Sequence, residues 1–328
     1  MSVLKLTPSS QPASASTGEI YYDSSKNKFK FYNGSKWVYF DSYGDYETAG
    51  ATINSSAVSG YDLIVFTAGD GSSSYKFRPL GTVEIDLLIV SAGGGSTTYS
   101  AGAGGGQVIT HTGVIISNRA EYYITVGTGS ANANGGDSFF KHSDGSTVQY
   151  QAIGGGRGSS SSTAIDGGSG GGAGSSDSSG SGGSSIKDTS HTSFSGGTIN
   201  NYGNAGGSND TTSPGYSTGG GGGAGSGAVG GNASSGQAGN GGNGIDVSAT
   251  FGTTYGDSGV FGGGGGGMIR SSSGFGTGGS GGGGRGGTST GGDGVAGSAN
   301  TGGGAGGQGT SGSNLAGGSG IVIIRVAK

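Results

Sequence analysis

The sequence predicts an all-β fold, in which a β-sandwich-like framework carries a layer of polyglycine II helices and a small aromatic β-meander precedes both. Of the 87 glycines in the 328-residue chain, 79 lie in the 238 residues from Ser91 to Lys328. Aliphatic segments of strand length lie before this glycine-rich part and at its end, where they read as buried strands. No segment shows the apolar period of a helix.

The composition narrows the classes of function. The net charge is −4 and charged residues make up 10% of the chain, which argues against a nucleic-acid partner. The chain has no cysteine, so it has neither a disulfide framework nor thiolate chemistry. The first residues show no apolar h-region, so we expect no signal peptide, and no run is long and apolar enough to span a membrane.

The N-terminal part consists of a polar arm (1–17) and an aromatic meander (18–45). Strands are predicted at 18–23, 28–32 and 36–40, and Asn33-Gly34 indicates a hairpin between the last two. Period-two alternation suggests one apolar face, made by Ile20, Tyr22, Phe29, Phe31, Trp37 and Tyr39. Three short strands are too few for independent stability, so Tyr22, Phe29, Phe31, Trp37 and Tyr39 are candidates for docking onto another chain.

The remainder, 61–328, is predicted to form one glycine-rich domain. Its framework comprises 61–153, with strands at 61–67, 82–92, 106–112, 122–127 and 147–153. The chain closes on IVIIRV (321–326), in which five of six residues are aliphatic. A disordered tail would have no reason to end in this way. We therefore predict that 321–326 pairs centrally with the framework and that 154–320 is an excursion anchored at both ends.

Glycine occurs in tracts such as 93–95, 104–106, 154–156, 219–223 and 262–267. One interpretation is a flexible linker. The alternative is a set of polyglycine II helices, which have three residues per turn and keep their N–H groups, so that neighbouring helices can bond side by side. A Cβ directed into such a bundle would push the helices apart. Ser, Ala, Asn and Thr between the tracts are therefore expected at outer positions and turns.

No constellation of catalytic or metal-binding residues stands out. GGNGIDVSA (241–249) matches a calcium-repeat pattern only in part, because Ser248 stands where a large apolar residue is needed and the motif does not recur. A GxSxG match at 167–171 is expected by chance in a chain so rich in glycine and serine. The three histidines are scattered, and the carboxylates are isolated in sequence. We predict no catalytic residue, no metal and no cofactor.

The non-glycine islands at 193–203, 209–218, 245–261 and 268–276 are the candidates for binding. They place aromatic side chains among small polar residues, as antibody paratopes do. The predicted receptor-binding residues are Tyr202, Tyr216, Phe251, Tyr255, Arg270 and Phe275. The alternative is that Phe251, Tyr255, Phe261 and Phe275 only plug the ends of the glycine bundle.

Several segments together resemble a known family. DLLIVSAGGG (86–95), AGAGGGQVI (101–109), YYITVGTG (122–129), NGGDSFF (134–140) and GGSGIVIIRV (317–326) are similar to the glycine-rich domain of bacteriophage tail proteins, in particular to the polyglycine-II sandwich of tail-fibre-tip adhesins. The meander, GEIYYDSSKNKFKFYNGSKWVYF (18–40), resembles short aromatic modules of phage virion proteins.

This resemblance implies a non-enzymatic virion protein of tail-fibre or tail-tip type, assembled in the host cytoplasm and exposed on the particle. It implies docking to other virion proteins through the N-terminal region, a homotrimer, and a host surface glycan or outer-membrane protein as receptor. Three alternatives stay open: a purely structural virion component (a decoration or a connector), a bacterial surface protein, and a polysaccharide depolymerase.

Overall fold

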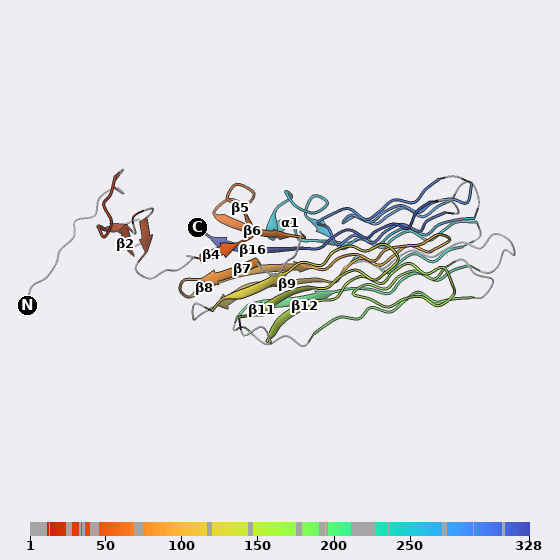
Figure 1. Cartoon of the computed structure of the whole chain (residues 1–328), viewed down its shortest axis with the longest axis horizontal. Coiled ribbons are helices and arrows are strands. Elements are labelled where there is room, and N and C mark those ends of the chain that lie inside the picture. The colour runs from red at the N-terminus through yellow and green to blue at the C-terminus, as the bar shows by residue number, and fades with distance from the viewer. Residues whose placement is uncertain are drawn as a thin grey trace, which may run out of the picture.

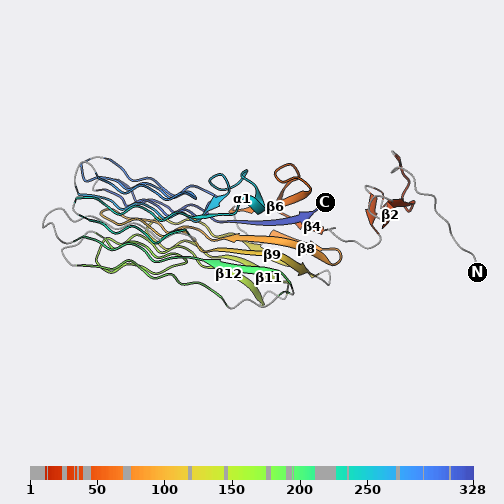
Figure 2. The ribbon, with the colours of Figure 1, turned by 180° about the vertical axis from the view of Figure 1, so that it is seen from behind.

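The computed structural model describes residues 12, 14–23, 28–32, 34, 37–39, 46–68, 75–116, 120–143, 147–174, 179–189, 194, 196–210, 227–234, 236–270, 274–290, 292–309 and 312–328. The body is elongated, with the long strands gathered at one end and the glycine-rich segments running side by side from them to the other end (Figure 1). The reverse view shows the same division (Figure 2). Within the described residues only a single helical turn, α1 (Ser248–Phe251), interrupts the predicted all-β architecture.

Two antiparallel sheets form the sandwich. The five-stranded sheet has the order β12 (Val148–Ala152), β11 (Ser138–His142), β10 (Tyr122–Thr125), β7 (Tyr75–Pro79), β4 (Tyr46–Ala49). The six-stranded sheet has the order β13 (Thr198–Tyr202), β9 (Val108–Ile116), β8 (Val83–Val90), β16 (Ile321–Ala327), β6 (Tyr61–Thr67), β5 (Thr52–Asn54). A small hairpin, β14 (Ile245–Asp246) and β15 (Val260–Phe261), lies beside them.

The predicted central position of the last strand is confirmed. β16 pairs with β8 on one side and with β6 on the other, so that Ile323 lies opposite Leu88 and Val65. Residues 321–324 are fully buried. Because the strand that ends the chain lies between strands from its first third, the glycine-rich excursion is held at both ends.

The sandwich extends further towards the N-terminus than the predicted start at Tyr61. β4 pairs with β7 in the five-stranded sheet, and β5 pairs with β6 in the six-stranded sheet. Both strands are short and polar, and neither shows clear apolar alternation. Their positions at the edges of the two sheets account for this composition, since an edge strand buries little.

Apolar side chains form two clusters, one on each face of the six-stranded sheet. The cluster between the two sheets includes Phe66, Phe77, Ile89, Phe140 and Tyr150. The second cluster lies on the other face, where Val247, Phe251 and Phe261 from the β14–α1–β15 segment cover Leu63, Val65, Leu88 and Ile323. Both faces of β8 and β16 are therefore buried, which explains their almost continuously aliphatic sequences.

A partly buried ion pair joins the two central strands. Asp86 and Arg325 lie opposite each other in β8 and β16, and Arg325 Nε donates a hydrogen bond of 2.7 Å to Asp86 Oδ2. Asp86 Oδ1 accepts a hydrogen bond of 2.8 Å from the backbone N–H of Gly113 in β9, and the Arg325 guanidinium lies over the Tyr61 ring. The pair thus links the last strand to β8, β9 and β6.

The hydrogen bonds of the glycine segments repeat every three residues. Ala92 and Gly95 donate to Gly136 and Ala133, which lie on one neighbouring segment and are also three residues apart. Between them, Gly93 donates to Gly318 and Gly94 to Gly104, which lie on two further segments. Three successive residues that face three different neighbours indicate a helix with three residues per turn, the polyglycine II geometry that the tracts predict.

The same period recurs across the bundle. Ala101 and Gly104 donate to Ser159 and Gly156, and Ala103 and Gly106 donate to Ala305 and Gly302, so these neighbours run antiparallel. Gly263 and Gly266 donate to Gly281 and Gly284, so that pair runs parallel. A bundle that accepts both directions can be built from a single chain that turns back repeatedly.

The helices approach too closely for most side chains. A Cβ on Gly93, Gly94 or Gly95 would overlap the carbonyl oxygen of Gly303, Gly156 or Ser130, respectively. The obstruction is backbone in each case, so it cannot be relieved by rotation of a neighbouring side chain. The tracts consist of glycine because their neighbours occupy the Cβ position on all three sides of the helix.

The expectation that alanine lies at outer positions and turns is wrong for several residues. Ala101, Ala103, Ala173 and Ala305 are fully buried within the glycine-rich part. The packing therefore leaves room for a methyl group at particular positions of the repeat, and the exclusion of Cβ is set position by position.

Asparagine and aspartate side chains replace missing neighbours at the edge of the bundle. Asn240 and Asn243 Oδ1 accept hydrogen bonds from the backbone N–H groups of Thr277 (2.9 Å) and Ser280 (3.2 Å). Asn134 and Asp137 do the same for Arg157 and Gly154. In both motifs two glycines separate the acceptors, so one full turn brings each acceptor to the same side of the helix.

Gly265→Ala tests the close packing of the helices. The added methyl would overlap the carbonyl oxygen of Ala305, so we expect a loss of about 1–3 kcal/mol in the free energy of unfolding. Thr277→Ala, at an exposed position of a neighbouring helix, is the control and should change stability far less. Thermal unfolding followed by circular dichroism measures both. Equal melting temperatures for the two variants would contradict a packed bundle.

The double variant Asn240→Ala/Asn243→Ala tests the edge acceptors. Each alanine leaves one backbone N–H without its acceptor, and we expect a loss of roughly 0.5–1.5 kcal/mol per site. Asn240→Asp/Asn243→Asp keeps an oxygen at both positions and should retain most of the stability. If the alanine and aspartate variants unfold at the same denaturant concentration, the side-chain acceptors contribute nothing.

Candidate binding surfaces

The three predicted strands of the aromatic meander are confirmed, as β1 (Ile20–Asp23), β2 (Lys28–Tyr32) and β3 (Trp37–Tyr39). They form a separate antiparallel sheet in the order β1–β2–β3. In Figures 1 and 2 this sheet lies beyond the strand end of the body. The meander and the far glycine turns thus lie at opposite ends of the long axis.

The predicted single apolar face is wrong in part. Ile20 and Tyr22 lie opposite Phe31 and Phe29, so these four residues share a face as expected. Trp37, however, lies opposite Tyr32, which puts its side chain on the other face. The register of the β2–β3 hairpin decides this, and alternation within each strand does not specify it.

Both faces of the meander therefore carry aromatic residues. The Trp37 ring packs edge-on against Tyr21 and Tyr32, with centroids 5.7 and 5.6 Å apart. On the other face Tyr22 contacts Phe29, which stays 46% exposed. The side chain of Tyr39 lies outside the described residues. An exposed aromatic ring on so small a sheet is consistent with the predicted docking role.

The far end of the body is made of turns between glycine helices. β8 ends at Val90 and β9 begins at Val108, so the chain between them leaves the sandwich and returns through a turn at Thr97–Ser100. Ser100 Oγ donates to the Thr97 carbonyl within this turn. At about 3.1 Å per residue, seven residues carry the turn about 20 Å beyond the strands.

Tyr99 is the residue in this turn that sequence reasoning missed. It is 41% exposed and has a φ of 56°, in the left-handed region. A bulky residue rarely adopts that conformation, which costs of order 1–3 kcal/mol. Only its position in the sequence could have indicated a role, because Tyr99 is the sole aromatic residue between the tracts 93–95 and 104–106.

Two of the predicted receptor-binding residues lie near the far end, and each takes part in a cation–π contact. Exposed Arg270 lies over the Tyr99 ring, with 5.5 Å between Cζ and the ring centroid. Phe275 is 39% exposed, and the Arg285 guanidinium lies over its ring, with 5.2 Å between Cζ and the ring centroid. Hydrogen bonds from Gly286 to Gly276 and from Val295 to Arg285 place Phe275, Arg285 and exposed Val295 on three adjoining helices.

The other predicted receptor-binding residues lie beside the sandwich. Phe251 is buried in the cluster that covers the six-stranded sheet, where it offers no surface to a receptor. Tyr202 and Tyr255 are half-buried against the same cluster, and the Tyr255 hydroxyl accepts a hydrogen bond of 3.2 Å from Asn54 Nδ2. Tyr216 lies outside the described residues. The structure thus separates the candidates that it describes into two groups.

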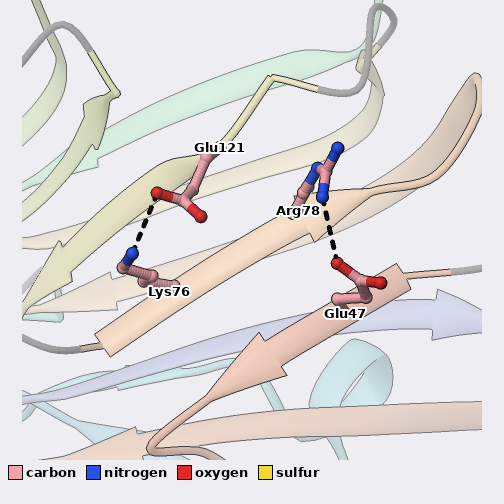
Figure 3. Close-up of polar contacts among 4 residues, drawn as sticks. All are labelled: Glu47, Lys76, Arg78 and Glu121. Carbon is pink, nitrogen blue, oxygen red and sulfur yellow. Dashed lines mark hydrogen bonds and ion pairs between the residues drawn. The ribbon is translucent and has the colours of Figure 1, made fainter.

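The outward face of the five-stranded sheet carries paired charges. Lys76 lies 3.0 Å from Glu121, and Arg78 lies 3.2 Å from Glu47 across β7 and β4 (Figure 3). The hydrogen bond from Lys76 lowers the pKa of the Glu121 carboxyl, and the same bond raises the pKa of Lys76. These charges compensate one another on an exposed surface, so they contribute little net attraction for a charged partner.

Comparison with known proteins assigns most of the body to one family. The family model described as Glycine-rich domain matches residues 66–327. The chain belongs to the glycine-rich domain family. Its match runs from β6 to β16 and leaves the meander outside. No curated protein matches the chain.

In this glycine-rich domain the described residues contain no group of three or more acidic or histidine side chains that could hold a metal ion. Asp246, in the partial calcium motif, instead accepts hydrogen bonds from the Ser248 side chain and from the Ser248 N–H (2.8 Å), and these bonds lower the pKa of its carboxyl. The described part of the chain also holds no helix with the length and hydropathy of a membrane span.

Trp37 is the sole tryptophan, so its fluorescence reports on the meander alone. Because three short strands bury little surface, we expect the Trp37 transition at a lower temperature than the circular dichroism transition of the glycine-rich domain. If copies associate through the meander, the Trp37 transition will rise with protein concentration. Coincident transitions at every concentration would show instead that the meander and the domain unfold as one unit.

Proposed function

We propose that this chain is a virion protein of the bacteriophage tail-fibre or tail-tip type, which contributes to recognition of the host surface and catalyses no reaction. In this proposal the meander docks onto other virion proteins, the chain forms a homotrimer, and the far turns face the host. A host surface glycan or an outer-membrane protein is the receptor. The protein is assembled in the host cytoplasm and is exposed on the particle.

The observation that carries the proposal is Tyr99. Tyr99 has a strained left-handed backbone, although 41% of its surface is exposed and its ring contacts the exposed Arg270 side chain. Glycine, which is abundant on both sides, would adopt the same conformation without strain. A residue kept against its backbone preference at an exposed turn is best explained by contact with a partner, and aromatic residues dominate binding hot spots.

The shape of the domain supports the same assignment of roles. The interior of the bundle is mostly backbone and small side chains that are buried, whereas the turns carry large exposed side chains such as Tyr99 and Arg270. The two ends of the long axis are therefore suited to different tasks, attachment at the meander and recognition at the turns. Many copies on one particle would strengthen weak single contacts through avidity.

Tyr99→Gly separates recognition from folding. We expect the melting temperature to hold or rise, because the substitution relieves the backbone strain. Binding of the fluorescently labelled full-length chain to a panel of Gram-negative and Gram-positive bacteria should fall at least tenfold on any strain that the wild type binds. Asn132→Gly is the matched control, since Asn132 is an exposed residue that also has positive φ.

Three outcomes would count against the proposal. If no strain in a broad panel binds the wild-type chain, a purely structural virion component becomes the better account. If Tyr99→Gly and Asn132→Gly weaken binding equally, the far turn at Tyr99 has no specific role. Release of reducing sugar from capsular polysaccharide by the wild-type chain would overturn the non-enzymatic assignment.

A further inference from the structure

Arg270 and Arg285 share an arrangement that is unusual for exposed arginines. Each guanidinium lies over an aromatic ring that is itself exposed, Tyr99 in one case and Phe275 in the other. Neither arginine has a carboxylate partner in the described part of the chain; Arg285 donates only to the carbonyl of Gly286. Stacking fixes the plane of a guanidinium and leaves its N–H edge free.

Two carboxylates from the same stretch of sequence, Asp257 and Asp293, are engaged with uncharged groups. Asp257 Oδ2 accepts from the N–H of Gly281 at 2.9 Å, and Asp293 Oδ1 accepts from the amide of Gln308. Both carboxylates thus accept hydrogen bonds from amide groups of the chain, and neither forms an ion pair with Arg270 or Arg285. This contrasts with the face in Figure 3, where each cation is paired with a glutamate.

We propose that the Tyr99–Arg270 and Phe275–Arg285 pairs bind acidic sugar units of a surface polysaccharide. The guanidinium edge would hold a carboxylate or phosphate with two parallel hydrogen bonds, which its planar fork matches. The exposed aromatic surface beside it, and Val295 beside Arg285, would pack on the C–H face of a sugar ring. This inference rests on the proposed function, since it names the ligand class of the far end.

Non-specific attraction does not explain such binding, because the chain carries a net charge of −4 and repels polyanions at long range. Selectivity must come from the two local pairs. A repeating acidic polysaccharide would engage both pairs on one chain and would gain from multivalency.

Binding of full-length protein to immobilised probes tests the proposal. Polygalacturonate supplies carboxylates, yeast phosphomannan supplies phosphodiesters, and dextran is the neutral control. We expect binding to at least one acidic probe and none to dextran. Arg270→Gln and Arg285→Gln should each weaken binding at least tenfold. The affinity of Arg270→Lys should lie between those of Arg270→Gln and the wild type, because lysine keeps the charge but lacks the planar fork of the guanidinium.

Arg157→Gln and Lys187→Gln are the matched controls, because they remove the same charge from positions without an aromatic partner. If all four charge removals weaken binding equally, or if neither acidic probe binds, the proposal is overturned. Loss of bacterial binding in Tyr99→Gly, together with no binding to either probe, would refute the acidic-sugar assignment and leave recognition by the far end intact.

Discussion

The structure depends on backbone hydrogen bonds between glycine helices that lie too close for a Cβ atom. Ordering glycine costs more conformational entropy than ordering any other residue, and the bundle has few apolar side chains to bury in return. It offsets this cost with hydrogen bonds in three directions from each helix, as residues 93–95 show. The contacts are available only if the neighbours are already in place, so the bundle is a cooperative unit that needs an anchor.

The sandwich supplies that anchor through ordinary hydrophobic burial. β16 lies between β8 and β6, and the Asp86–Arg325 pair fixes its register against both. A slip of one residue would separate the two charges and turn Ile323 away from its cluster. The β14–α1–β15 segment covers the outer face of the same sheet, so Phe251 and Phe261 tie the middle of the excursion to the core. The glycine helices thus start from fixed positions at several points along the chain.

Much of this could be predicted from the sequence, because the apolar strands and the glycine tracts each have a single physical explanation. The return of 321–326, the meander strands and the three-residue helix are examples. What could not be predicted depends on register between segments. Period-two alternation shows which residues of one strand share a face with Trp37. The register of the β2–β3 hairpin decides which face of the sheet that is. The composition of 245–261 resembles that of a binding loop, yet Phe251 packs against the apolar outer face of the six-stranded sheet. The left-handed backbone of Tyr99 likewise has no signature in composition.

The three-residue period also separates what the helices and the turns can tolerate. Removing one residue from an arm such as 101–106 would rotate every later N–H by about 120°, towards the wrong neighbour, whereas removing three would restore the phase. The turns do not share this three-residue constraint, because a change in their length does not alter the register within the arms. Residues such as Tyr99 and Arg270 can therefore be exchanged without disturbing the bundle. A rigid glycine interior and freely variable turns are two consequences of one geometry.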